Sequence, residues 1–234
     1  MRLHVGTSGY NFPEWKGTFY PEKFPESKML AYYAERLGTV EINYTFYRMP
    51  NVKTIAGWSE VTPPGFTFVL KAPQRITHFA RLKEVESPLR YFCDTALGLG
   101  TKLGPLLFQL PPNFKKEIDR LDEVLRLVPP GIRTAWEFRH GSWFDDEVYR
   151  VLRTRNAALC VADTETGTTP QVATGSFGYV RLRDAGYPPE ALERWAATIK
   201  QLGAGWEEAY VFFKHEEAGQ GPALAAQFAA LFAA

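Results

Sequence analysis

Short apolar runs recur along the chain and predict buried strands. They are rich in β-branched, aromatic and leucine side chains, and several are almost uninterrupted, which is typical of parallel strands covered on both faces. A half-solvated antiparallel strand would instead alternate apolar and polar residues. We predict about eight strands, at Leu3–Thr7, Thr39–Asn43, Phe66–Lys71, Leu106–Leu110, Thr134–Phe138, Ala158–Ala162, Tyr179–Arg183 and Ala209–Phe213.

Helical periodicity fills the segments between these runs. Apolar residues recur there at steps of three and four, and most segments carry a start signal such as Ser-Pro or a stop signal such as glycine. The expected helices run from a Ser27 cap to Gly38, from Ser87-Pro88, from Phe114 to Val128, from a capping box at Ser142–Asp145, from Leu192 to Gly203, and from Pro222.

This alternation predicts an α/β fold, a single (β/α)8 TIM-type barrel of parallel strands. The length of 234 residues suits such a barrel, which often runs to about 200 to 250 residues as one unit. No glycine-serine linker or compositional break divides the chain, so we expect one domain over residues 1–234. A doubly wound open sheet is the alternative, which the absence of G-x-G-x-x-G and G-x-x-x-x-G-K-[ST] motifs after the strands disfavours.

Composition and charge narrow the classes of function. The chain has 27 Lys+Arg and 26 Asp+Glu, a formal net charge of +1, which excludes a uniformly basic nucleic-acid arm or an acidic disordered tail. Cys93 and Cys160 lie far apart in apolar surroundings, which indicates buried thiols. No export-type leader or membrane-length apolar run is visible, so we expect a cytoplasmic protein with no membrane partner.

Polar residues gather where the predicted strands end. The carboxyl ends of the strands meet at one rim of a TIM barrel, and the chemistry of such proteins gathers there. The candidate catalytic residues are Glu41, Lys71, Glu137 and Asp163. The candidate substrate-binding residues are Thr7, Ser8, Tyr10, Asn43, Tyr47, His78, Gln109, Arg139, His140, Arg181, Lys214 and His215.

Side-chain alternation along the strands directs part of this set into the barrel. Glu41 shares a face with Asn43, and Glu137 shares one with Arg139. Because isolated burial of a charge costs several kcal/mol, these groups must pair or face a water-filled mouth. A buried ion-pair network that only holds the barrel together is one interpretation. The gathering of so many ionisable groups at one rim favours a functional site.

The first long loop carries five aromatic residues, at Tyr10, Phe12, Trp15, Phe19 and Tyr20. Such rings suit either a stacking lid over a ring-bearing ligand or a hydrophobic plug beneath an ordered loop. We favour the plug for Trp15 and Phe19, because the tight turns beside them need apolar support.

Ordered motifs along essentially the whole chain resemble those of the DUF72 (YecE-like) family. They are Gly6-Thr-Ser-Gly-Tyr10, Val40-Glu-Ile-Asn-Tyr-Thr-Phe-Tyr47, Lys71-Ala-Pro73 with Thr77-His78, Gln109-Leu-Pro-Pro112, Glu137-Phe-Arg-His140 and Tyr179-Val-Arg181. The resemblance implies a TIM barrel. The likeness of that family to the endonuclease IV type of barrel implies nucleic-acid or phosphoester chemistry.

The chain departs from the family's pattern after its last two strands. Relatives commonly read Arg-Leu-His-Gly and Phe-Asn-Asn, whereas this chain reads Arg181-Leu-Arg-Asp184 and Phe213-Lys-His-Glu216. A cation and an imidazole thus replace two neutral amides. We expect a preference for a more anionic ligand, or a variant reaction.

Phosphoester hydrolysis or transfer on a nucleotide-like or nucleic-acid-like substrate is the first functional hypothesis. Lysine and arginine would hold phosphate oxygens, and Glu137 or Glu41 would act as general base. The cations suited to this are Lys71, Arg139, Arg181 and Lys214. A version with a divalent metal would recruit Glu41, Glu137, Asp163 and His215. The net charge of +1 gives little support to duplex binding.

Two further hypotheses need no metal. In one, the chain acts on a small carboxylate or sugar-like acid, with Lys71 as base or Schiff-base nucleophile. In the other, it is a binding module that senses an anionic metabolite without turnover. Borohydride trapping on Lys71 would identify the first, and a Glu137→Gln variant that still binds would indicate the second. Elemental analysis would test the metal-dependent version.

Overall fold

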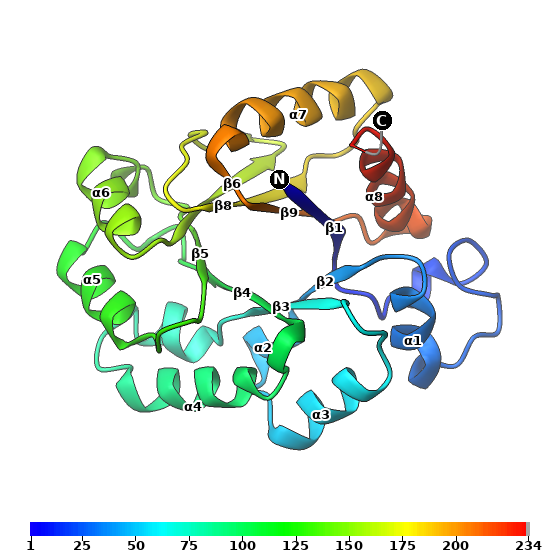
Figure 1. Ribbon diagram of the computed structural model, residues 1–234, viewed down its shortest axis with the longest axis horizontal. Helices are drawn as coiled ribbons and strands as arrows, with labels where there is room; N and C mark the ends of the chain where they lie inside the picture. Colours follow the sequence, from blue (N-terminus) through cyan, green and yellow to red (C-terminus); the bar gives the residue numbers. More distant parts are fainter. Residues whose placement is uncertain (233–234) are drawn as a thin grey trace.

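Eight parallel strands close into a barrel in the computed structural model, which describes residues 1–232 (Figure 1). They are β1 (Arg2–Ser8), β2 (Thr39–Ile42), β3 (Thr67–Lys71), β4 (Leu103–Gln109), β5 (Thr134–Glu137), β6 (Ala158–Thr164), β8 (Phe177–Arg183) and β9 (Glu208–Phe213). Each pairs in parallel with the next, and pairing of β9 with β1 completes the ring. The predicted TIM-type barrel is confirmed, and every predicted run is a strand.

Helices surround the barrel on its outer face (Figure 1). They are α1 (Met29–Ala34), α3 (Val52–Glu60), α4 (Glu86–Leu97), α5 (Ile118–Leu127), α6 (Asp146–Thr154), α7 (Pro189–Leu202) and α8 (Gln220–Ala230). The short helix α2 (Tyr44–Tyr47) lies inside this ring, after the carboxyl end of β2. The expected helices are all present, and α2 and α3 were not predicted. Within residues 1–232, none of the helices has the length and apolar character needed to cross a bilayer.

Two capping predictions were wrong. The carboxylate of Asp145, rather than the hydroxyl of Ser142, caps α6 by accepting a hydrogen bond from the backbone N–H of Val148. Ser142 Oγ instead accepts from the backbone N–H of Lys116. Ser27 lies in a 3-10 turn before α1, and no side chain caps that helix.

The connection from β6 to β8 departs from strict alternation of strand and helix. Residues 165–176 form β7 (Gly167–Thr168), which runs antiparallel to β6, and they contain no helix. The hydroxyls of Thr169 and Thr174 accept hydrogen bonds from backbone N–H groups of β6 at 2.9 and 2.7 Å. These bonds hold the loop against β6. The loop thus takes the place of the helix that the other strand-to-strand connections contain.

Alternation along the strands separates an outer layer from an inner one. Val40, Trp136 and Leu182 pack with the helices, whereas Val69 and Leu107 fill the barrel interior. The two thiols are buried and free, as predicted.

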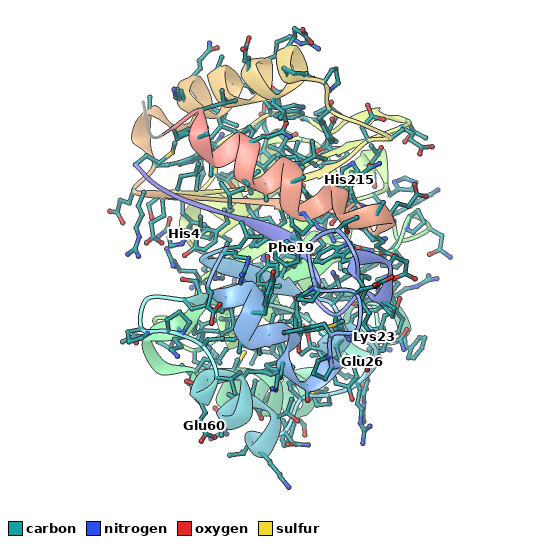
Figure 2. All side chains as sticks on the ribbon, turned by 90° about the vertical axis from the view of Figure 1, so that its right-hand side faces the viewer. His4, Phe19, Lys23, Glu26, Glu60 and His215 are labelled. Atoms are coloured by element: carbon teal, nitrogen blue, oxygen red, sulfur yellow. The ribbon has the colours of Figure 1, made fainter. Side chains whose placement is uncertain are left out.

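A polar cluster closes the amino-terminal end of the barrel. Arg133 donates to Glu208 Oε2 at 2.5 Å and to Tyr210 Oη at 2.7 Å. The ring of His4 stacks on Tyr210 with 4.5 Å between centroids. Figure 2 shows His4 and His215 toward opposite ends of the barrel. The cluster therefore lies at the end remote from the candidate site.

Packed aromatic rings support the first long loop. Trp15 and Tyr20 are buried, and Phe19 meets Trp15 edge-on with 5.8 Å between ring centroids. Figure 2 shows Phe19 between the ribbons of α1 and α8. The plug predicted for Trp15 and Phe19 is confirmed, while Tyr10 and Phe12 line a cavity beside it.

Candidate functional site

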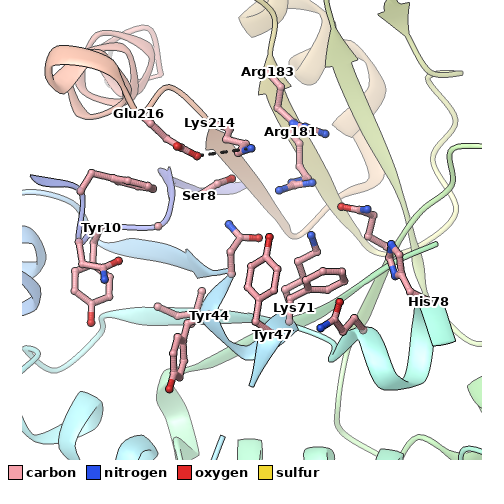
Figure 3. Close-up of a pocket in the computed structure, with 18 of the residues that line it drawn as sticks. Ser8, Tyr10, Tyr44, Tyr47, Lys71, His78, Arg181, Arg183, Lys214 and Glu216 are labelled. Carbon is pink, nitrogen blue, oxygen red and sulfur yellow. Dashed lines mark ion pairs between the residues drawn. The ribbon is translucent and has the colours of Figure 1, made fainter. Parts of the chain in front are cut away.

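A cavity of about 860 Å³ opens at the carboxyl ends of the strands (Figure 3). This rim is where TIM barrels bind their ligands, because the loops that follow the strands converge there. Ten of the residues predicted from the sequence line it: Ser8, Tyr10, Asn43, Tyr47, Lys71, His78, Gln109, Arg139, Arg181 and Lys214. Glu41 and Glu137 lie beneath them, bound to Arg181.

Arg181 is the centre of a buried ion-pair network at the cavity floor. Its Nη2 donates to Glu41 Oε1 at 2.7 Å and its Nη1 donates to Glu137 Oε2 at 2.5 Å. Tyr179 donates its hydroxyl to the second oxygen of Glu41 at 2.6 Å. The three charged side chains are at most 2% exposed. The buried ion-pair network that the sequence analysis gave as one interpretation is therefore present, and it lies at the floor of the cavity.

The buried carboxylates are held in their ionised form. Burial alone would raise the pKa of Glu137, but the positive charges of Arg181, Arg139 and their neighbours outweigh burial and lower the pKa to about 2. Burial likewise acts to raise the pKa of Glu41, and Arg181 with the Tyr179 hydrogen bond lowers it. A strongly acidic carboxyl whose oxygens already accept hydrogen bonds is a poor proton acceptor. These two residues are therefore suited to fixing Arg181 rather than to general base catalysis.

Further guanidinium groups surround the floor. Arg139 donates from Nε to Glu137 Oε1 at 3.0 Å and from Nη2 to Gln109 Oε1 at 3.3 Å. Arg183 lies 3.6 Å from the same Glu137 oxygen, and its Nε is buried with no hydrogen-bond partner among the described residues. With Lys71 protonated, the floor carries 4 − 2 = +2, from Lys71, Arg139, Arg181 and Arg183 against Glu41 and Glu137. Such an excess attracts anions.

Lys71, the last residue of β3, places its amine on the cavity floor. The residue is 8% exposed, and Nζ lies 4.1 Å from the centroid of the Phe46 ring. Burial and the charge of Arg181 lower the pKa of Lys71 to about 7, which Glu137 and Glu41 only partly oppose. A substantial fraction of the amine is therefore neutral near pH 7 and carries a free electron pair.

Aromatic side chains form much of the remaining wall. Tyr10, Phe12, Phe46, Tyr47 and Trp58 line the cavity. Trp58 comes from α3, which the sequence analysis missed because Gly57 and β-branched residues weaken its helical signal. Asn51 caps this helix, because its side chain accepts a hydrogen bond from the Thr54 backbone N–H at 2.9 Å. An asparagine at this position was the signal in the sequence that could have revealed the start of the helix. Gln74, from the loop after β3, was also missed.

Two predicted site residues near the rim do not line the cavity. Thr7 is buried, and its hydroxyl donates to the carbonyl oxygen of Gly9 at 2.6 Å. The Nδ1 atom of His140 accepts from the backbone N–H of Ser142 at 3.1 Å. Both side chains thus order the turns that follow their strands.

Asp163 and His215 also lie outside the lining. Asp163 accepts a hydrogen bond from the hydroxyl of Tyr187 at 2.8 Å, and His215 Nε2 contacts the carbonyl oxygen of Asp184 at 2.7 Å. Within residues 1–232, no group of three His, Cys, Asp or Glu side chains is placed to hold a metal ion. The four donors considered for a metal therefore do not come together.

The fold and the cavity define a TIM-barrel protein whose site has a cationic floor and an aromatic wall. The chain belongs to the family described as "Protein of unknown function DUF72", whose model matches residues 4–234. The resemblance seen in the sequence motifs is confirmed.

Individual relatives agree with this assignment. The UPF0759 protein YecE of Escherichia coli (strain K12) is 27% identical over 143 residues, 61% of this chain and 50% of the relative. The UPF0759 protein YunF of Bacillus subtilis (strain 168) is 29% identical over 155 residues, 63% of this chain and 54% of the relative. The matches thus span about half the length of these curated relatives.

Solved structures of the family have the same architecture. The crystal structure of a DUF72 family protein from Thermotoga maritima matches with a TM-score of 0.86 and 29% identity, covering 100% of both chains. A DUF72 family protein from Enterococcus faecalis matches with a TM-score of 0.80 at 18% identity, covering 100% of this chain and 98% of the other. The second likeness concerns the fold alone.

Proposed function

We propose that the cavity binds a small organic anion that carries a ring, of which a nucleotide is one example. The observation that carries the proposal is the excess of positive charge at the floor, from Lys71, Arg139, Arg181 and Arg183 against Glu41 and Glu137. This excess is 4 − 2 = +2 with Lys71 protonated and 3 − 2 = +1 with Lys71 neutral. A phosphate or carboxylate there would compensate charge that the protein itself leaves uncompensated.

The anionic group fits best on the side of Arg139 and Arg183. Arg183 Nε has no partner among the described residues, and a guanidinium binds phosphate or carboxylate through directed pairs of hydrogen bonds. Lys214 also lines the cavity, although Glu216 lies 3.6 Å from its Nζ (Figure 3). Arg183 and Lys214 are positions at which the chain departs from its family's motifs, which supports a more anionic ligand here.

The ring of the ligand fits the aromatic wall. Tyr10, Phe12 and Trp58 contribute aromatic surface to the cavity lining, and Figure 3 shows Tyr10 away from Lys71 and Arg181. Offset or edge contacts between rings contribute about 0.5 to 1.5 kcal/mol beyond the burial of area. A ligand that combines a ring with an anionic group would therefore bind more tightly than either part alone.

Phosphoester hydrolysis on such a ligand stays a hypothesis, but the geometry disfavours the general bases first assigned to it. Glu41 and Glu137 accept hydrogen bonds from Arg181. A proton acceptor for this reaction would be sought in His78, whose pKa burial and the charge of Lys71 lower. A product assay with nucleotide and aryl phosphates would separate turnover from binding alone.

The binding proposal is tested by calorimetric titration with adenosine 5′-monophosphate, phenyl phosphate, benzoate, adenosine and inorganic phosphate. We expect at least one ring-bearing anion to bind more tightly than adenosine or phosphate, and to weaken as salt rises. Arg183→Gln should cost about 10-fold or more in affinity, as expected for a charge-assisted hydrogen bond. Arg150→Gln, at an exposed position on α6, is the matched control. If no ring-bearing anion distinguishes wild type from Arg183→Gln, the proposal is wrong.

A further inference from the structure

We propose that Lys71 is a nucleophile that forms an imine with an aldehyde or ketone group of the anion bound in the cavity. The inference rests on the proposed anion binding and narrows its ligand to a carbonyl-bearing organic anion. It adds a covalent bond between the protein and the ligand, which the binding proposal alone does not require.

The position of the amine is the first support. Lys71 ends β3, and its side chain points into the cavity toward Arg181 (Figure 3). Phe46 covers one side of the ammonium at 4.1 Å. The neighbouring carboxylates give their oxygens to Arg181 at 2.5 and 2.7 Å. The amine is therefore buried and adjacent to a cation, and it faces the space where a ligand would lie.

Other partly buried lysines of the chain are held differently. Lys102 donates from Nζ to the carbonyl oxygens of Ser59 and Thr62, both at 2.6 Å. Those bonds engage the hydrogens of this amine with backbone acceptors. For Lys71, by contrast, burial and the positive charge of Arg181 lower the pKa to about 7. Desolvation beside another cation is the arrangement that activates lysine as a nucleophile.

Imine formation balances with the groups present. The electron pair of the neutral Nζ attacks the carbonyl carbon, and the carbonyl π pair moves to oxygen, which takes up a proton. The nitrogen gives up a proton, and the carbinolamine hydroxyl then takes up a second proton and leaves as water while the nitrogen pair forms the C=N bond. The protonated imine that results releases this second proton when it becomes the neutral imine. The net change is amine plus carbonyl to imine plus water, and it needs no oxidant or reductant.

His78 is placed to carry the proton between these steps. Its ring meets the Phe46 ring edge-on with 4.8 Å between centroids, and Lys71 lies against the same Phe46 ring. His78 lines the cavity, and its Nδ1 contacts the Thr77 hydroxyl at 2.9 Å, which leaves Nε2 for exchange. A protonated imine would carry the same positive charge as the lysine ammonium, which a bound anion would compensate.

The test uses pyridoxal 5′-phosphate, an aldehyde that carries both a ring and a phosphate, followed by borohydride reduction and peptide mapping by mass spectrometry. Exposed ammonium groups stay protonated at neutral pH, so Lys71 should be labelled on the order of 10²-fold faster at pH 7 than the exposed Lys53. Lys102 should stay unlabelled. Labelling of Lys71 that is no faster than that of Lys53 would overturn the proposal.

Two variants separate the covalent step from anion binding. Lys71→Arg keeps a positive charge but supplies no nucleophilic amine, so the rapid adduct should be lost, while calorimetry of the wild type with phenyl phosphate measures anion binding separately. Arg183→Gln should slow labelling by the phosphate-bearing aldehyde and leave labelling by pyridoxal, which lacks phosphate, little changed. If wild type binds ring-bearing anions but Lys71 is labelled slowly by both aldehydes, the nucleophile is refuted and the binding proposal stands.

Discussion

Arg181 Nη1 lies 2.5 Å from Glu137 Oε2, although the two residues are 44 positions apart in the chain and almost fully buried. Removing two charges from water costs several kcal/mol, so such a pair is a weak source of net stability. It does fix β8 relative to β5 across the barrel interior. It also holds the guanidinium of Arg181 at the cavity floor, among Lys71, Arg139 and Arg183.

Glu137→Gln should lower the free energy of unfolding by about 3 to 5 kcal/mol, because it leaves the buried Arg181 guanidinium short of a charge partner. Urea unfolding followed by circular dichroism measures this change. The matched control is Arg126→Gln, which removes the exposed pair of Arg126 with Asp122 on α5 and should cost less than about 1 kcal/mol. Equal losses in the two variants would contradict the role assigned to the network.

Acid should destabilise the protein in a defined pH window. The pKa of Glu137 is about 2 in the folded chain, against an ordinary value of 4.5, so the unfolded chain binds more protons between these values. Stability from this residue is present above about pH 4.5 and is lost as the pH falls toward 2. The urea midpoint should therefore fall across this window, and less steeply in Glu137→Gln. Parallel curves for the two proteins would show that Glu137 is not the group responsible.

The strands could be predicted from the sequence because each is a short run rich in β-branched, aromatic and leucine residues, and several of the runs are almost uninterrupted. Alternation then placed Glu41 and Glu137 inside the barrel, where the structure has them. Helix α3 could not be predicted in the same way, since Gly57 interrupts its signal. The cap of α6 was misassigned because Ser142 and Asp145 both qualify as caps, and tertiary contacts decide between them.

Position at a strand end was insufficient to show which polar residues face the cavity. Asp163 and His215 lie at or just beyond the carboxyl ends of strands, near which Glu137 and Lys71 also lie, yet Tyr187 and Asp184 engage them in local hydrogen bonds. Those partners come from the loop after β8, whose path has no signature in the sequence. The selection of site residues is thus made by loop geometry rather than by strand pattern.

Substitution at the amino-terminal end should affect stability without affecting ligand binding. Arg133→Met removes the hydrogen bonds to Glu208 and Tyr210, and because Arg133 is partly exposed we expect a loss of about 1 to 3 kcal/mol. The cavity lies at the other end of the barrel, so affinity for ring-bearing anions should stay within about twofold of wild type. Urea unfolding and calorimetric titration of the same preparation measure both quantities. A large loss of affinity would contradict this prediction and show that the cluster at the amino-terminal end influences binding in the cavity.

Gly6 permits the close approach of β1 and β2. A Cβ at this position would lie 2.1 Å from the carbonyl oxygen of Thr39, a backbone atom that cannot rotate away. Gly6→Ala should therefore destabilise the fold by about 3 kcal/mol or more, as expected for overpacking against a rigid neighbour.

Gly57→Ala provides the contrast, since the same methyl group would meet nothing within 4 Å on α3. Alanine in a helix interior is more favourable than glycine by about 0.5 to 1 kcal/mol. At about 2 to 4 °C per kcal/mol for a chain of this size, the melting temperature should fall clearly in Gly6→Ala and rise slightly in Gly57→Ala. If Gly6→Ala had the same melting temperature as wild type, β1 and β2 could move apart without loss of stability. The register between Thr7 and Val40 would then not be tightly fixed.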